Sequence, residues 1–300
     1  MNKSQLYCYY APRIYKYCFA DMKGEPMKTG TELIKEIQDC SPKEGSLAFW
    51  WLGQRGYAIK LGDWTVYIDM FLSDRHDRNI PPLLKPEDVN NAHFIIGSHD
   101  HSDHIDRKVW RRLHLSSPNA RFIVPKVHIT SLSNDLDIPK DRFIGLDDRV
   151  SIDLQGLKIT GIASAHEFLD RDPITGSYPC LGYVIEGNGC TIYHSGDTCM
   201  YEGLQKKLMS WDKIDVMFVP INGRDGRRYR KNIIGNMTYQ EAVDLAGTIK
   251  PGLVVPGHYE MFSSNSEDPE LFADYIGAKY PDVKYWIGKH GEKVIVDKIS

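Results

Sequence analysis

The stretch His99-Asp100-His101-Ser102-Asp103-His104 places three histidines and two aspartates within six residues. It follows the apolar run 93–97, which predicts a buried strand, and precedes residues 105–115, which predict a helix. Imidazole and carboxylate groups are the ligands that borderline and hard divalent cations prefer. The alternation of His99 and His101 aims two rings to one side, whereas Asp103 and His104 on the next turn can face a second ion. We interpret the stretch as a metal-binding loop; the alternative, a solvated polar loop, would leave crowded groups with coupled titrations.

Three further ligand-type side chains follow predicted strands elsewhere in the chain. They are His166 after residues 157–163, Asp197 after residues 190–194 and His258 after residues 252–256. Taken alone, each is more typical of a hydrogen-bonded loop residue than of a metal ligand. Together with the loop at 99–104 they form a coherent set, large enough to bind two ions.

The order of apolar runs and turn signals predicts an α/β protein with two sheets covered by outer helices. The spacing Thr29-Gly30-Thr31-Glu32 predicts a capping box at the start of a helix that continues through Ile37. The expected strands are 46–52, 56–61, 64–69, 93–97, 121–125, 149–154, 157–163, 181–186, 190–194, 214–220, 252–256, 283–287 and 293–296; further helices are expected at 105–115, 128–134, 238–250 and 268–279. No linker divides the chain, which favours a single domain.

Composition excludes several classes of protein. The 300 residues contain 37 Lys and Arg against 40 Asp and Glu, a net charge of −3 that gives no footprint for bulk nucleic-acid binding. No apolar run approaches the roughly 18 residues of a membrane-spanning helix. Six cysteines without a Cys-x-x-Cys pair indicate reduced thiols in a cytoplasmic protein. The aromatic-rich lead-in before residue 29 either packs on its own domain or forms an arm toward another subunit; its aromatic residues are Tyr7, Tyr9, Tyr10, Tyr15, Tyr17 and Phe19.

The motif His-x-His-x-Asp-His, with the later histidines and the Gly196-Asp197 pair, resembles that of the metallo-β-lactamase-fold hydrolases. The early Asp69 at a strand end also matches their pattern. This resemblance runs from about residue 46 to the C-terminus, so the chain divides into a lead-in with a helix (1–45) and the family-like domain (46–300). It implies a single four-layer αββα sandwich with the site at one edge of its two sheets.

The resemblance also implies roles for individual residues. The first metal would be bound by His99, His101 and His166, the second by Asp103, His104 and His258, with Asp197 bridging them. Asp69 would lie behind these ligands and orient them through hydrogen bonds. Asp100, which points away from its neighbours, is expected in the same supporting layer, and His194 is either supporting or merely structural.

Two cations held about 3.5–4 Å apart can share a water and lower its pKa towards about 7, which makes hydrolysis by a bridging hydroxide the expected reaction. Asp197 would be catalytic as the bridge. Asp103 either shuttles the proton to the leaving oxygen or is only a ligand. Zn²⁺ suits the histidine-rich set, and Mn²⁺ also suits a site of nitrogen and oxygen ligands.

A Gly- and Arg-rich segment after residues 214–220 is the predicted anion-binding element. Its candidate substrate-binding residues are Asn222, Arg224, Arg227, Arg228 and Arg230. Arginines bind phosphate or carboxylate through paired N–H groups; the alternative is a solvated basic loop or a subunit contact. This segment, with 48–53, 98–106 and 193–197, resembles the bacterial ascorbate-6-phosphate lactonases. That subgroup implies a small anionic substrate, a cytoplasmic location and a homo-oligomer.

Two other functions stay open at this point. A phosphodiesterase of the same superfamily would need a basic surface for RNA, which the net charge disfavours, or an exposed apolar entry for lipids, which the N-terminal tyrosines can supply. A non-catalytic metal-binding regulatory protein would be marked by the loss of a ligand, and all seven ligand positions are filled.

Overall fold

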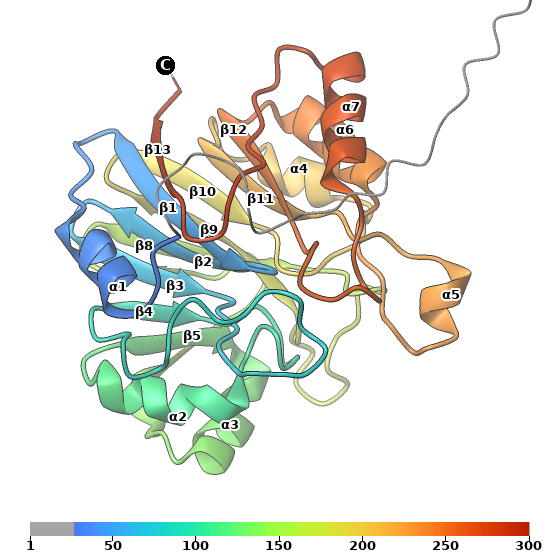
Figure 1. Ribbon diagram of the computed structural model, residues 1–300. Coiled ribbons are helices and arrows are strands. Elements are labelled where there is room, and N and C mark those ends of the chain that lie inside the picture. Colours follow the sequence, from blue (N-terminus) through green and yellow to red (C-terminus); the bar gives the residue numbers. More distant parts are fainter. Residues whose placement is uncertain (1–26, 300) are drawn as a thin grey trace, which may run out of the picture.

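Two β-sheets pack face to face in the computed structural model, which describes residues 27–299 (Figure 1). The first sheet contains, in spatial order, β13 (Lys293–Asp297), β1 (Ser46–Gly53), β2 (Gly56–Leu61), β3 (Trp64–Ile68), β4 (Phe94–Ile96), β5 (Arg121–Pro125) and β6 (Phe143–Leu146). The second contains β12 (Leu253–Gly257), β11 (Val216–Pro220), β10 (Cys190–His194), β9 (Leu181–Gly187), β8 (Leu157–Ala163) and β7 (Ser151–Asp153).

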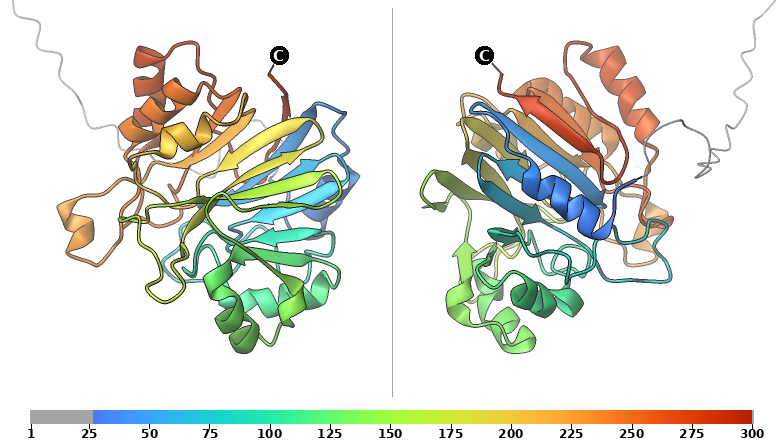
Figure 2. Two further views of the ribbon diagram at one scale, coloured as in Figure 1. Left: turned by 180° about the vertical axis from the view of Figure 1, so that it is seen from behind. Right: turned by 60° about the vertical axis from the view of Figure 1, so that its left-hand side comes forward.

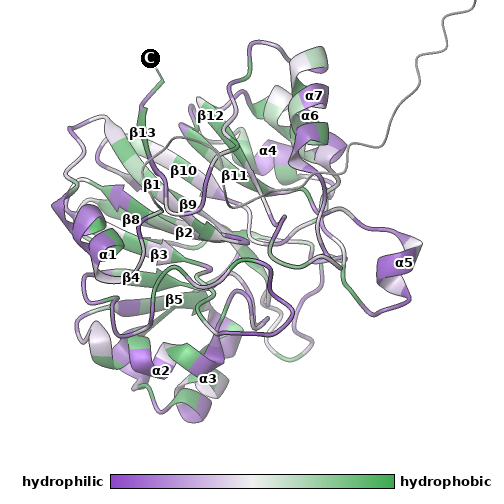
Figure 3. Cartoon of the chain, in the orientation of Figure 1, coloured by the Kyte–Doolittle hydropathy of each residue, from purple (hydrophilic) through white to green (hydrophobic). Residues whose placement is uncertain are grey.

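Strand β1 shows why the sheets lie inside the molecule. Leu47, Phe49 and Trp51 belong to the core between the sheets, whereas the alternate side chains of the strand pack beneath the helices on the other face. Phe49 meets Phe218 of the second sheet edge-to-face, with ring centroids 5.2 Å apart. Because both faces of β1 are buried, its sequence is continuously apolar, without the polar alternation of a half-exposed strand. Apolar residues run along the strands in the same way in Figure 3.

Helices cover the outer face of each sheet (Figure 2). On the first sheet lie α1 (Gly30–Asp39), α2 (Arg107–Ser116) and α3 (Ile129–Leu136), with the short 3-10 helices η1 (Lys126–His128) and η2 (Lys140–Arg142) beside α3. On the second lie α4 (Leu204–Leu208), α6 (Tyr239–Ile249) and α7 (Pro269–Lys279). The short α5 (Gly226–Tyr229) projects from the body in Figure 1. The αββα sandwich expected from the sequence is thereby confirmed.

Local expectations fail at a few places. Thr29 precedes α1 but its side chain forms no cap hydrogen bond; Gly30 has φ +55° and donates its N–H to the carbonyl of Leu83. The capping box instead occurs at Thr238 and Glu241, at the start of α6. The expected strand at 283–287 is reduced to one bridge, between Val254 and Tyr285. Strand β6 and helices α4 and α5 are additions that the sequence patterns did not indicate.

Strand direction brings distant segments to one edge of the sandwich. In the first sheet β3 and β4 are parallel, and β1 runs the same way because two antiparallel pairings separate it from β3. In the second sheet β10, β11 and β12 are parallel, and β8 shares their direction through β9. The residues that follow these seven strands therefore meet at a common edge.

Several predictions from the sequence concern the N-terminal segment, membrane-spanning helices and the cysteines. The tyrosine-rich lead-in lies outside the described residues, and the division at residue 46 stays a prediction. None of the helices in the described part is long and apolar enough to cross a bilayer. The four described cysteines, Cys40, Cys180, Cys190 and Cys199, are free thiols.

Candidate metal centre

Six side chains form two groups of potential metal ligands at the common edge of the sheets. The first group is His99, His101 and His166; the second is Asp103, His104 and His258. Within each group the ligand atoms lie within 4.8 Å of one another. These are the same two sets that the sequence resemblance implied, and they come from the loops after β4, β8 and β12.

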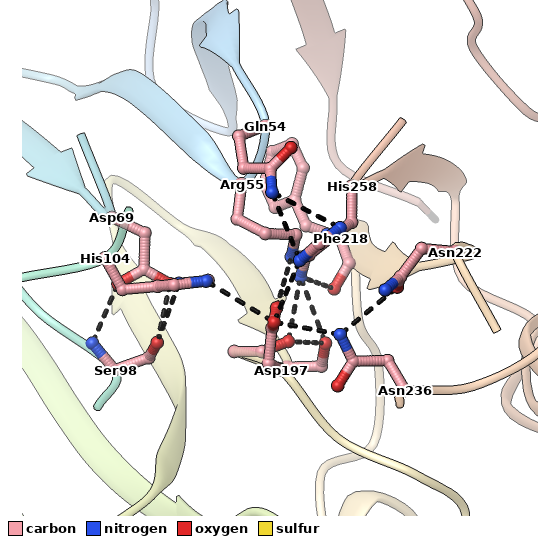
Figure 4. Close-up of polar contacts among 12 residues, drawn as sticks. Gln54, Arg55, Asp69, Ser98, His104, Asp197, Phe218, Asn222, Asn236 and His258 are labelled. Carbon is pink, nitrogen blue, oxygen red and sulfur yellow. Dashed lines mark hydrogen bonds and ion pairs between the residues drawn. The ribbon is translucent and has the colours of Figure 1, made fainter. Parts of the chain in front are cut away.

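Asp197, in the loop after β10, lies between the two groups. It forms a third set of clustered ligand atoms with His99 and His104. Its Oδ2 is 3.0 Å from Nε2 of His258 and 3.4 Å from Nε2 of His104 (Figure 4). Asp197 thus contacts two members of the second group and lies within 4.8 Å of a ligand atom of His99 from the first group, a position from which a carboxylate can bridge two ions.

The donor atoms have the character of a metal site. Nε2 of His99 and Oδ1 of Asp197 are buried and have no hydrogen-bond partner. Nε2 of His166 faces Nδ1 of His101 at 3.1 Å, although two neutral imidazoles can satisfy such a contact only if one nitrogen carries the proton. Unpaired buried lone pairs are costly, and a cation among them removes that cost. The residues present therefore fit divalent ions.

Burial and mutual charge shift the pKa values in this cluster. Burial lowers the pKa of His166 to about 4, and burial with neighbouring histidines holds the pKa of His99 well below its usual value. Burial also opposes a charged His104, but Asp197, Asp69 and Asp103 outweigh it and raise its pKa well above normal. Neutral His99 and His166 have free lone pairs, which metal binding requires.

A supporting layer fixes the orientation of His104. Asp69 accepts from its Nδ1 at 2.8 Å, which leaves Nε2 facing Asp197. Asp69 is held in turn by the N–H and Oγ of Ser98, both at 2.7 Å. Its backbone has φ +47°, a conformation that non-glycine residues rarely adopt, so the tertiary structure holds this side chain in place. The geometry agrees with the supporting role expected for Asp69.

His194 and Asp100 make different contacts from Asp69. His194 accepts from the N–H of Gly196 at Nδ1 and donates from Nε2 to the carbonyl of Arg55, so it bonds to backbone and to none of the candidate ligands. Burial, aided by Arg55, lowers its pKa to about 3. Both carboxylate oxygens of Asp100 accept from Arg107. Among the described contacts, no hydrogen bond joins Asp100 to a candidate ligand, so its carboxylate is held by Arg107 beside the loop.

Sequence patterns gave no sign of two residues in the turn between β1 and β2. Gln54 donates from Nε2 to Oδ2 of Asp103 at 3.0 Å, and the same nitrogen lies 3.2 and 3.3 Å from the ring nitrogens of His258. Arg55 is fully buried, donates to Oγ of Ser195 and to two carbonyls, and lies 3.9 Å from Asp197. The complete burial of these two polar residues, which makes them conspicuous, is visible only in the folded structure.

A cavity of about 370 Å³ opens over the ligand cluster. His101, Asp103, His166, Asp197 and His258 line its floor. The rest of its lining includes Arg75, Asp77, Phe262 and Asn265, together with residues 232–234. A second, larger depression of about 840 Å³ lies over β7–β10 and contains none of the candidate ligands.

The predicted anion-binding arginines do not line this cavity, which corrects the expectation for that segment. Arg224 is bound at both terminal nitrogens by Glu241, 2.7 Å each, so it ties the loop to α6. Arg228 donates to the carbonyl of Ser266 and pairs with Asp225. Arg227 and Arg230 are exposed on and beside α5. The segment reaches the cavity through residues 232–234 instead.

Asn222, the remaining candidate of that segment, is fully buried and bonds to Asn236 and Asn265. It does not line the cavity. The cation that does is Arg75, from the loop after β3. Arg75 pairs with Asp77 through two hydrogen bonds, of 2.9 and 2.6 Å, and its guanidinium lies 5.0 Å from the ring centroid of Phe262.

Comparisons with known proteins agree with this architecture. The sequence profile of a family described as beta-lactamase superfamily domain matches residues 65–259. A UPF0173 metal-dependent hydrolase of Archaeoglobus fulgidus is 29% identical over 83% of this chain and 98% of its own length. Another, from Sulfolobus acidocaldarius, is 30% identical over 58% of this chain and 71% of its own length. A metallo hydrolase from Ignicoccus hospitalis has a similar structure, with a TM-score of 0.64 and 20% identity over 83% of this chain and 98% of that one.

Proposed function

The chain belongs to the beta-lactamase superfamily and, within it, to the UPF0173 metal-dependent hydrolases; from this premise we propose a dinuclear metal-dependent hydrolase of small anionic lactones or esters. The observation that carries the proposal is the pair of ligand groups connected through Asp197. His99, His101 and His166 would hold one ion, and Asp103, His104 and His258 the other.

Two divalent ions, when bound, supply an activated water and polarise the attacked carbonyl or phosphoryl oxygen. Zn²⁺ suits the histidine-rich first group, and Mn²⁺ is the alternative for a set of nitrogen and oxygen ligands. The protein's own contribution is orientation. Asp69 fixes His104, and Gln54 holds Asp103 beside the cavity. Asp103 is 19% exposed there and is the carboxylate placed to pass a proton to a leaving oxygen.

The cavity supports a small anionic substrate. Its volume of about 370 Å³ suits a molecule of metabolite size, and Arg75 in its lining, although paired with Asp77, keeps Nη1 available as a hydrogen-bond donor. Phe262 and residues 233–234 provide an apolar surface for a carbon skeleton. Arg75 replaces the loop arginines as the expected contact for a phosphate or carboxylate. A phosphorylated lactone of the ascorbate-6-phosphate type satisfies these features.

The test combines metal analysis with a hydrolysis screen. Purified protein loaded with Zn²⁺ or Mn²⁺ is expected to retain two equivalents of metal and to open phosphosugar lactones faster than it cleaves phosphodiesters. Asp197→Asn should lower kcat at least about a hundredfold, because it removes the charge between the two groups. Arg230→Ala, at an exposed position outside the cavity, is the matched control and should retain activity. Undiminished turnover by Asp197→Asn would refute the mechanism.

A phosphodiesterase is the second candidate, favoured by one observation. The loop that follows His166 carries exposed apolar side chains, with Phe168 65% and Ile174 92% exposed. Such a rim suits a lipid-like substrate better than a sugar. Faster cleavage of a phosphodiester than of any lactone in the same screen, reduced by Phe168→Ser, would decide for this alternative.

A further inference from the structure

A chain of three asparagines runs from Asp197 to the wall of the cavity. Asn236 donates from Nδ2 to Oδ2 of Asp197 at 2.8 Å and to Oδ1 of Asn222 at 3.1 Å (Figure 4). Asn222 donates from its own Nδ2 to Oδ1 of Asn265 at 2.8 Å. Asn222 and Asn236 are fully buried, whereas Asn265 is half-buried and lines the cavity.

The carboxylate at one end fixes the direction of every amide in this chain. An ionised carboxylate only accepts hydrogen bonds, so Asn236 must turn its NH₂ group toward Asp197. The second hydrogen of that group then requires the oxygen of Asn222, which turns the NH₂ of Asn222 toward Asn265. Amide orientation is ambiguous for an isolated asparagine, but a connected network with a defined end removes the ambiguity.

Asn265 is therefore left with its NH₂ group pointing away from the network. Among the described residues this nitrogen has no hydrogen-bond partner, and its oxygen is already occupied by Asn222. We infer that Asn265 presents a directed hydrogen-bond donor to an oxyanion of the substrate, and that Asn222 is the positioning residue that sets this direction. The inference rests on the proposed function, because it assigns substrate recognition in the same cavity.

The donor defines a chemical class of ligand. A phosphate or carboxylate oxygen can accept from Asn265, whereas an ammonium group or another donor at that place would leave the amide hydrogens unpaired. Arg75 also lines the cavity, with Nη1 free of the Asp77 contact, because Asp77 binds only its Nε and Nη2. The two donors together favour an oxygen-rich acceptor such as a phosphate or carboxylate over a cationic substrate.

Inorganic phosphate is a suitable probe, with binding to the metal-loaded protein followed by titration calorimetry and metal content measured for each variant. Asn265→Leu removes the donor without adding charge and should weaken phosphate binding about tenfold. Asn222→Asp should also weaken phosphate binding about tenfold, although residue 222 does not line the cavity. Its two acceptor oxygens force Asn265 to turn its NH₂ inward and its oxygen to the cavity. Asn222→Leu only frees the Asn265 amide and should stay within about threefold of the parent.

A double variant distinguishes the effect of the Asn265 amide orientation from the effect of the negative charge that Asn222→Asp adds. Asn222→Asp placed in the Asn265→Leu background should cause no further loss, because its effect passes through Asn265. Ser263→Ala, at an exposed position that does not line the cavity, is the control and should bind phosphate as the parent does.

Four results would overturn the inference. The first two are an unchanged phosphate affinity in Asn265→Leu and an equal loss of affinity in Asn222→Leu and Asn222→Asp. The others are a loss in the double variant, relative to Asn265→Leu, as large as that of Asn222→Asp alone, and loss of bound metal in Asn222→Asp. A protein with one ion or without esterase activity would defeat the proposed function and still leave this order of phosphate affinities measurable.

Discussion

Gln54 and Asp103, 49 positions apart in the sequence, are joined by a hydrogen bond of 3.0 Å from the amide nitrogen to Oδ2 of the carboxylate. The same amide lies against His258, so one side chain from the β1–β2 turn contacts two of the three candidate ligands of the second group. Gln54 has φ +52° and His258 has φ +64°. Both backbones are held in a rarely populated conformation where the ligands meet, which is common at functional sites.

Gln54→Leu is expected to weaken binding of the second ion about ten- to a hundredfold, because residues that orient ligands typically contribute that much to metal affinity. The first group of ligands does not contact Gln54, so the first ion should bind as before. Competition with a chromophoric chelator measures both affinities. Gln155→Leu is the matched control: Gln155 also has a left-handed backbone, φ +57°, but is exposed in the β7–β8 turn. Equal metal affinities in the two variants would contradict the role of Gln54.

Arg55 should contribute to stability as well as to the charge balance around Asp197. Its guanidinium bonds to Ser195 and to the carbonyls of Gly196 and Phe218, which joins the loop after β10 to strand β11. Arg55→Met leaves these acceptors and Asp197 buried without their partner and should lower the free energy of unfolding by about 2–4 kcal/mol. Urea unfolding of the metal-free protein measures the difference. Arg149→Met, at an exposed position, should stay within about 0.5 kcal/mol of the parent.

Removal of metal should destabilise the protein. The unpaired Nε2 of His99 and the unpaired Oδ1 of Asp197 remain buried when no ion compensates them. An ion present at a hundred times its dissociation constant adds about 2.7 kcal/mol to the free energy of unfolding. Thermal unfolding with and without a chelator should therefore show a lower Tm in the chelator, restored by Zn²⁺. The same chelator should leave the Tm of a variant lacking His99, His101 and His166 much less affected.

His290 gives the stability a dependence on pH. The ring stacks on Trp51, with centroids 3.9 Å apart, and burial, aided by Arg78, lowers its pKa to about 4. The unfolded chain binds this proton near the ordinary pKa of about 6.5, so the contribution to stability is complete above that pH and is lost as the pH falls through 4.

His290→Phe keeps an aromatic ring on Trp51 and removes the titrating group. Between pH 6.5 and 4 the parent should lose up to about 3 kcal/mol more unfolding free energy than this variant. Urea unfolding in a chelator, which excludes metal release, tests the difference, and His76→Phe at an exposed position is the control. If the unfolding free energies of His290→Phe and the parent fell equally between pH 6.5 and 4, His290 would not be the source of the pH dependence.

Sequence patterns were enough to predict a two-sheet α/β fold and a clustered set of ligand-type side chains, and the family resemblance divided that set into two groups. The ligands stand directly after apolar strands, and strands that share a direction must end at one edge, so a local pattern was enough to place His99, His166, Asp197 and His258 together. Hydrophobic runs likewise marked most strands, because burial on both faces leaves a continuous apolar signature.

The surroundings of those ligands follow from tertiary packing. Gln54, Arg55 and Asn265 are ordinary polar residues in sequence, and their roles depend on which distant partners they meet. The composition near α5 predicted an anion site, but in the structure Arg224 donates to Glu241 and Arg228 donates to the carbonyl of Ser266. A hydrogen bond is directional and works only over about 3 Å, so its partners follow from the packing of whole elements and not from spacing along the chain.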